Sequence, residues 1–239
     1  LFERIAQLTG KNLPLAMLFQ APTIEQLAAI LRQENWAPAW KSIVPVQPGG
    51  TNPPLFILPP AASTVLNFAA VIRHLPAYQP VYGLQYVGLE DNESPHQSVE
   101  AMATYYVDQI CKFQPEGPYL VGGICFGAHV ALEIAQELQR QGKSVALLVL
   151  LDAGPPANGP TWRYPRRFTL DHFRTMAETW REEGVTTWLY RRLRYRYVRL
   201  RNFLKPRKKY FEDAFAVHLK AYTSYQGRPY SGRMLLIQS

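Results

Sequence analysis

The sequence predicts an α/β fold with a mostly parallel sheet, and three observations support this prediction. Short apolar runs such as "PLFILP" and "SVALLVLLD" are continuous rather than alternating, as in strands buried on both faces. Helical patterns separate these runs, as in parallel sheets covered by helices. The 239 residues are 47% hydrophobic, which is ample for a packed core.

Residues 1–34 precede this pattern and predict a small all-helical unit. "LFERIAQLTG" has apolar positions on one helical face and ends at Gly10, a residue that tolerates the left-handed conformation of a helix end. A second helix begins at "PTIEQLAAILRQ", where Thr23 and Gln26 have the spacing of a capping box. Its apolar stripe predicts a side that faces a core: Ile24, Leu27, Ile30 and Leu31.

Residues 35–53 are predicted to form a linker, because "ENWAPAWKSIVPVQPGGTNPP" contains five prolines and a Gly-Gly pair and cannot sustain a helix. The second domain is then 54–239. Its strands and helices are expected, in order, at "PLFILP" (strand), "PVYGLQY" (strand), "SVEAMATYYVDQICKF" (helix), "PYLVGGI" (strand), Phe126 to about Gln141 (helix), "SVALLVLLD" (strand), "FAVHLKAYTSY" (helix) and "GRMLLIQS" (strand).

An insertion of basic and aromatic residues, at about 160–215, interrupts this order. Residues 160–210 hold fifteen of the 26 Lys and Arg residues and four of the 18 acidic ones, so the net charge of +8 arises in one segment. This position argues against a protein built as a whole around nucleic acid. The segment therefore predicts a local basic patch that faces a partner; a merely solvated face is the alternative.

Other classes of protein find no support in the sequence. No apolar run reaches the ~18 residues of a membrane helix, and the N-terminus lacks a secretory pattern, which predicts a cytoplasmic protein without membrane contact. Cys111 and Cys125 are too few for a disulfide framework and lack metal-ligand spacing, so no metal site is expected.

A candidate nucleophile lies at "GGICFG". Gly123 to Gly127 fit the pattern G-x-nucleophile-x-G between a strand and a helix, with Cys125 at the apex. The two outer glycines avoid clashes in the tight turn, and the helix N-terminus favours a thiolate. The N–H of Phe126 is then predicted to bind a developing oxyanion. A small apolar residue at a strand end is the alternative interpretation of Cys125.

A candidate acid and a second oxyanion donor follow from the same fold. Asp152 ends the apolar strand that comes 27 residues after Cys125, where catalytic groups gather in open α/β sheets, although a turn-initiating Asp would look similar. In "FILPPAAST" the two prolines have no N–H, so Ala61 is the first candidate donor and Ala62 the second.

The general base has no clear candidate. In this fold a histidine follows the acid, and the histidines that do so lie in the insertion and in a helix: His172 and His218. The expected loop lies after Ser239, so the chain is predicted to be truncated at its C-terminal end. His129, one helical turn from Cys125, is a weaker alternative. The remaining histidines carry no signal: His74 and His96.

Two sets of motifs resemble a known family. "LTGKNLPLAMLFQAPTIEQLAAILRQ" is similar to the C-terminal half of a peptidyl carrier domain. "PLFILPP", "PYLVGGICFGAHVALEIAQEL", "LLVLLDAGPP" and "AYTSYQGRPYSGRMLLI" resemble the type I thioesterase that ends nonribosomal peptide synthetases, an α/β-hydrolase. The likeness covers nearly the whole chain apart from the insertion.

The resemblance implies a terminal thioesterase. A carrier domain, itself joined to upstream synthetase domains, would hold the finished chain on 4'-phosphopantetheine, attached to a serine before Leu1. The thioesterase itself would bind no cofactor. Cys125, Asp152, Phe126 and Ala61 match the family's nucleophile, acid and two oxyanion positions, and the insertion matches its lid.

The sequence departs from most members of the family by having cysteine rather than serine at the apex. Transfer from one thioester to another keeps the acyl group activated, so a weak internal nucleophile could close a strained ring such as a β-lactone or β-lactam. Hydrolysis and macrocyclisation stay open. Two other functions are alternatives: an inactive hydrolase-like module that docks a carrier domain, and a stand-alone acyl-thioester hydrolase.

Overall fold

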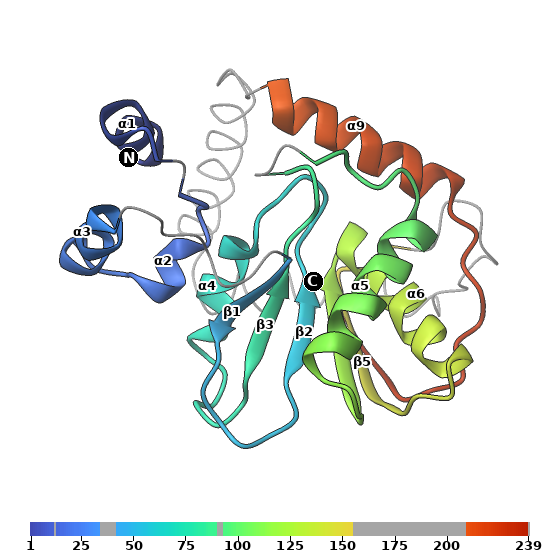
Figure 1. Cartoon of the computed structure of the whole chain (residues 1–239). Helices are drawn as coiled ribbons and strands as arrows, with labels where there is room; N and C mark the ends of the chain where they lie inside the picture. Colours follow the sequence, from blue (N-terminus) through green and yellow to red (C-terminus); the bar gives the residue numbers. More distant parts are fainter. Residues whose placement is uncertain (12, 34–41, 90–92, 155–208, 239) are drawn as a thin grey trace, which may run out of the picture. The chain divides into compact units, whose positions relative to one another are not determined.

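The computed structural model describes residues 1–11, 13–33, 42–89, 93–154 and 209–238 (Figure 1). Its N-terminal part contains α1 (Phe2–Thr9), α2 (Met17–Gln20) and α3 (Ile24–Arg32). The predicted ends are present: Gly10 has a φ of 70° after α1, and Thr23 and Gln26 form a capping box. The predicted apolar stripe is wrong at one position, because Ile24 is 89% exposed whereas Leu27 is buried.

The described residues of the second part form a six-stranded sheet in the order β1-β3-β2-β4-β5-β6. β1 runs antiparallel to β3, and the neighbours from β3 to β6 are parallel, which confirms the predicted α/β fold with a mostly parallel sheet. The strands are β1 (Ile43–Gln47), β2 (Leu55–Leu58), β3 (Val81–Leu84), β4 (Tyr119–Ile124), β5 (Val145–Leu151) and β6 (Met234–Ile237).

The strand β1 lies inside the range 35–53, which the sequence predicted to be a linker. The prolines of this range suggested an irregular chain, but β1 is at the edge of the sheet in the structure. An edge strand tolerates proline, because one side of its backbone has no partner strand. Pro45 pairs in register with Tyr82, and a register shift follows it. The sheet therefore begins before residue 54.

Helices cover the sheet through two separate hydrophobic clusters. Phe56 and Leu58 belong to one cluster with α5 (Val99–Phe113) and α6 (Phe126–Arg140), which lie side by side in Figure 1. Ile57, between them in the strand, belongs to the other cluster, with residues of η1 (Val65–Phe68) and α4 (Ala69–Ile72). Successive side chains of β2 therefore enter opposite clusters, as expected for a strand buried on both faces.

The helix α9 (Lys209–Ser224) returns the chain to the sheet after the region outside the described residues. Residues 210–239 belong to the same compact unit as residues 1–160. The range 160–215 predicted for a lid therefore includes the first turns of a helix that belongs to the unit of the sheet. Most of the predicted insertion, with His172 and its basic and aromatic residues, lies outside the described residues.

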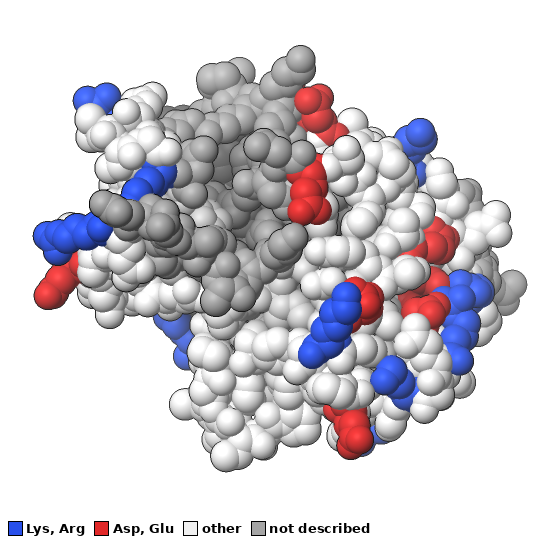
Figure 2. Space-filling model, in the orientation of Figure 1, with Lys and Arg blue, Asp and Glu red and all other residues white. Residues whose placement is uncertain are grey.

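Charged side chains on the face drawn in Figure 2 are scattered. Lys and Arg side chains of the described residues lie among Asp and Glu side chains there, and do not gather in one patch. This distribution agrees with the sequence, which concentrates the basic excess in 160–210.

Candidate active site

Cys125 lies at a sharp turn between β4 and α6. Its φ of 53° and ψ of −116° are unusual for a residue with a side chain, and the thiol belongs to an exposed residue. The N–H of Cys125 donates a hydrogen bond to the carbonyl of Leu151 over 2.8 Å. The turn thus presents the side chain to solvent while its backbone is fixed to β5.

The glycines on either side of Cys125 lie where a side chain has no room. A Cβ at Gly123 would overlap the carbonyl of Gly127, inside the turn. A Cβ at Gly127 would overlap the carbonyl of Pro59 and would lie 2.7 Å from that of Leu58. These contacts bring the first turn of α6 directly against the loop that follows β2. The turn at Cys125 and the predicted oxyanion loop are therefore packed directly against each other.

The N-terminus of α6 surrounds Cys125 with partial positive charge. Cys125 is the N-cap of this 15-residue helix, and the first turn has no acidic residue. Unpaired N–H groups and the helix dipole there favour an anion, either a thiolate or an oxyanion formed on a bound acyl group. The N–H of Phe126, the first helical residue, has the position that the sequence predicted for an oxyanion donor.

Asp152 follows the strand next to that of Cys125. Ile124 and Leu151 are register partners in the parallel pair of β4 and β5, so Cys125 and Asp152 are the next residues on two adjacent strands. Neighbouring strands lie about 4.8 Å apart. Asp152 has a φ of 48°, and its N–H donates to the carbonyl of Ile237 over 2.8 Å. The backbone around this carboxylate is thus tied to β6.

The predicted oxyanion loop is held by two contacts from outside it. The hydroxyl of Tyr86 donates to the carbonyl of Pro59 over 2.8 Å, and the N–H of Ala62 donates to Nδ1 of His218 over 2.9 Å. Ala62 has a φ of 48°. Because the Ala62 N–H is engaged by an imidazole, Ala61 is the better candidate for the second donor. This choice agrees with the order of preference that the sequence suggested.

The buried histidine of α9 does not have the geometry of a triad base. Nδ1 of His218 accepts a hydrogen bond, so its neutral ring carries the proton on Nε2, whereas a triad base must donate from Nδ1 to the acid. His129 packs against the rings of Tyr222 and Tyr225. Burial lowers the pKa of His129 and of His218 to about 4. The identity of the general base stays a prediction.

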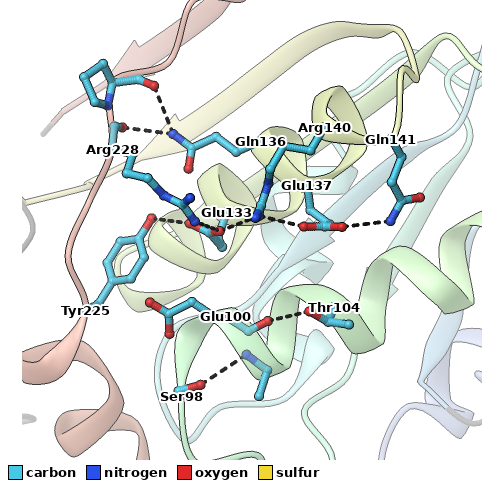
Figure 3. Close-up of polar contacts among 12 residues, drawn as sticks. Ser98, Glu100, Thr104, Glu133, Gln136, Glu137, Arg140, Gln141, Tyr225 and Arg228 are labelled. Carbon is cyan, nitrogen blue, oxygen red and sulfur yellow. Dashed lines mark hydrogen bonds and ion pairs between the residues drawn. The ribbon is translucent and has the colours of Figure 1, made fainter.

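A polar network anchors α6 to the chain that leaves α9, as Figure 3 shows. The carboxylate of Glu133 is buried and accepts hydrogen bonds from Arg140 (2.9 Å), Arg228 (2.7 Å) and the Tyr225 hydroxyl (3.1 Å). Burial raises the pKa of the Tyr225 hydroxyl, and the neighbouring Glu133 carboxylate raises this pKa further. The network holds the helix that has Cys125 as its N-cap.

Sequence reasoning missed both His218 and Glu133 as parts of this arrangement. Glu133 has a weak sequence signal, because it is a charged residue within the apolar run "HVALEIA" of α6. His218 has no such signal: its partner Ala62 is 156 residues away. Tyr86 likewise follows an ordinary strand pattern.

No helix among the described residues is long and apolar enough to cross a membrane. In the same part of the chain, no three His, Cys, Asp or Glu side chains are grouped so as to hold a metal ion.

Several known proteins are similar to this chain. The family model described as "Thioesterase domain" matches residues 53–223. The chain is 38% identical over 154 residues to malpinin synthetase of Mortierella alpina, and these residues cover 64% of the chain and 2% of that protein. It is 36% identical over 155 residues to the dimodular nonribosomal peptide synthase of Bacillus subtilis, and these residues cover 65% of the chain and 6% of that protein. The chain thus spans a small fraction of these relatives.

Solved structures show the same fold. The holo form of AB3403, a four-domain nonribosomal peptide synthetase bound to AMP and glycine, aligns with a TM-score of 0.62 and 25% identity, over 100% of this chain and 19% of that one. The NocB thioesterase domain, in covalent complex with a fluorophosphonate nocardicin G analog, aligns with a TM-score of 0.59 and 23% identity. This alignment covers 82% of this chain and 76% of that one.

Proposed function

Because the chain belongs to the thioesterase domain family, we propose that it takes a peptidyl or acyl chain from a phosphopantetheinyl carrier onto Cys125 and then releases it. One observation carries this proposal: Cys125 is exposed at the strained turn that begins α6, and Asp152 follows the adjacent strand. The relatives named above support this function, since one is named a synthetase and the other a dimodular nonribosomal peptide synthase.

The proposed reaction has two covalent steps. The Cys125 thiolate attacks the thioester carbonyl, the new C–S bond forms, and the C–S bond to pantetheine breaks, so that the pantetheine sulfur leaves and takes up a proton. Water or an internal nucleophile of the acyl chain then attacks the same carbonyl, gives its proton to a base, and displaces the Cys125 sulfur. The N–H groups of Phe126 and Ala61 would bind the oxyanion in both steps, and Asp152 would orient the histidine that serves as base.

The domain assignment is part of the proposal. Residues 1–34 would be the C-terminal helices of a peptidyl carrier domain, which agrees with their own small cluster around Met17, Ala21 and Leu27. The likeness to the four-domain synthetase covers the whole chain and supports this order of modules. Because β1 begins at Ile43, the linker would be limited to about 35–42. Phosphopantetheine would be bound by the carrier, and the thioesterase would need no cofactor of its own.

The thiol at position 125 favours release by cyclisation, including closure of a strained β-lactone or β-lactam. A thioester on Cys125 is about as activated as the one on pantetheine, whereas an ester on serine would be less reactive. Product analysis tests this idea by comparing the complete protein with its Cys125→Ser variant on the same acyl thioester. We expect the variant to release less cyclic product relative to the hydrolysed chain. An unchanged product ratio and rate would show that the thiol has no part in ring closure.

The basic segment at 160–215 would help the carrier domain to dock. Carrier domains present phosphate on their pantetheine arm, and opposite charges attract over about 10 Å at ordinary salt. Release from a carrier-bound substrate should therefore slow as ionic strength rises, while release from a free thioester analogue should stay constant. Equal salt dependence for both substrates would contradict docking by this segment.

A further inference from the structure

His218 lies in the middle of α9 and reaches the loop that follows β2. Its side chain is 1% exposed, although α9 carries exposed residues on either side of it, such as Phe215 and Leu219. Nδ1 accepts a hydrogen bond from the N–H of Ala62 over 2.9 Å. This contact joins the oxyanion loop to an element 156 residues further along the chain.

The ring of His218 also packs against the residue that follows Cys125. It stacks on the ring of Phe126 with centroids 4.8 Å apart and planes at 16°, and lies 4.4 Å from the ring of Tyr86. The Tyr86 hydroxyl in turn donates to the carbonyl of Pro59. One imidazole therefore contacts both segments that supply the proposed oxyanion donors.

The loop of residues 59–62 has few backbone N–H groups that could hold its conformation by hydrogen bonds. Pro59 and Pro60 have no N–H to donate, and Ala62 has a φ of 48°, in the left-handed region that is strained for a residue with a side chain. Such a conformation persists only when its surroundings hold it. The hydrogen bond to His218 is the contact that engages the N–H of this strained residue.

Nδ1 of His218 can accept the hydrogen bond from Ala62 because the imidazole ring is neutral. Burial lowers the pKa of His218 to about 4, so at neutral pH the ring is uncharged and Nδ1 has a free electron pair. Protonation would turn Nδ1 into a donor and remove the contact with Ala62.

We propose that His218 is a positioning residue: it holds the loop of residues 59–62 and the first turn of α6 so that the N–H groups of Ala61 and Phe126 converge on the oxyanion. This inference rests on the proposed thioesterase reaction at Cys125. It also makes α9 part of the catalytic architecture, although none of its side chains needs to touch the substrate.

Two substitutions separate the functions of the ring. His218→Phe keeps an aromatic ring beside Phe126 and Tyr86 but removes the acceptor. His218→Asn loses the stacking area but places an acceptor oxygen near the position of Nδ1. The complete protein is assayed by three measurements: the single-turnover rate of Cys125 acylation by an acyl thioester, the rate of Cys125 alkylation by iodoacetamide, and amide hydrogen exchange of residues 61–62.

We expect His218→Phe to acylate about 100-fold more slowly, comparable to the loss of one oxyanion donor. Alkylation forms no oxyanion and should stay within about twofold of the wild-type rate. Exchange at residues 61–62 should become faster in His218→Phe, and His218→Asn should recover both acylation and protection at least in part.

Other results would overturn the proposal. Unchanged acylation in both variants, or alkylation that falls in parallel with acylation, would show that His218 does not act through the oxyanion donors. Faster acylation in His218→Phe would mean that the imidazole competes for an Ala62 N–H that binds the oxyanion itself. If the wild-type protein is not acylated at all, the proposed function fails, and unchanged exchange at residues 61–62 would then separately exclude the positioning of the loop.

Discussion

The N–H of Cys125 donates to the carbonyl of Leu151 over 2.8 Å, and this hydrogen bond fixes the exposed thiol to the strand that ends at Asp152. β4 and β5 pair without a register shift from Leu120 opposite Leu147 to Ile124 opposite Leu151. The geometry therefore brings a cysteine thiol and a carboxylate to the carboxyl ends of two neighbouring parallel strands, where open α/β sheets bind ligands.

Asp152→Asn should slow Cys125 acylation by about 100-fold or more, because an amide cannot stabilise the charged histidine of a triad. The single-turnover acylation rate of the complete protein measures this effect. Asp108→Asn is a matched control, because Asp108 is an exposed residue of α5 that pairs with Lys112 on the surface. Equal rates for the two variants would argue that Asp152 only initiates a turn.

Gly127→Ala should destabilise the fold, although alanine is normally the better residue in a helix by up to about 1 kcal/mol. The new Cβ would overlap the carbonyl of Pro59 and push α6 away from the oxyanion loop. We expect a loss of about 2 kcal/mol, or about 4–8 °C in melting temperature. Gly49→Ala is the control, since no atom lies within 4 Å of its Cβ position. If both variants have the melting temperature of the wild type, the close contact between α6 and this loop is not present.

Glu133→Ala should also lower the free energy of unfolding, by about 2 kcal/mol, because the buried Tyr225 hydroxyl loses its acceptor. Arg140 and Arg228 are half exposed and can be rehydrated, so the loss stays below that of a fully buried ion pair. Glu137→Ala removes the other partner of Arg140, near the surface, and should cost less than about 1 kcal/mol. Urea denaturation measures both losses. An equal loss in free energy of unfolding for Glu133→Ala and Glu137→Ala would contradict the anchoring function of Glu133.

Acid should destabilise the protein through its buried histidines before the carboxylates titrate. Burial lowers the pKa of His129 and of His218 to about 4, below the usual 6.5, so the unfolded chain binds more protons between these values. Their contribution is fully present above about pH 6.5 and is lost as the pH falls toward 4. Between pH 7 and pH 5 we expect a loss of about 1–2 kcal/mol for each histidine.

Urea titrations at these two pH values test this dependence. His129→Gln should reduce the loss by about half, whereas His74→Gln changes an exposed histidine and should have no effect. A free energy of unfolding that is the same at pH 5 and pH 7 would show that these rings are accessible to protons in the folded state.

The sequence contained the parts of the site that depend on local backbone geometry. The turn around Cys125 could be predicted because its glycines stand where the chain has no room for a Cβ. Asp152 could be placed because a continuous apolar strand ends there. The ends of α1 and α3 followed from Gly10 and from the capping box of Thr23, which are also local signals.

Features that depend on distant contacts could not be predicted in this way. The strand β1 was not predicted because it contains Pro45. A proline is tolerated in this strand only because the strand lies at the edge of the sheet. The contact of Ala62 with His218 joins residues that no periodicity relates. Ile24 belongs to an apolar stripe in sequence but is exposed in the structure, since the pattern of a helix does not specify how far its packed face extends.

The most direct test of the account is intact-protein mass spectrometry of the complete protein after incubation with an acyl thioester. We predict an acyl adduct that maps to Cys125, disappears in Cys125→Ala and persists in Cys111→Ala. Cys111 is the suitable control, because it is a free cysteine that contacts the Tyr119 hydroxyl away from the nucleophile turn. An adduct that survives in Cys125→Ala would contradict the assignment of the nucleophile, and no adduct under any condition would favour a module that only binds a carrier domain.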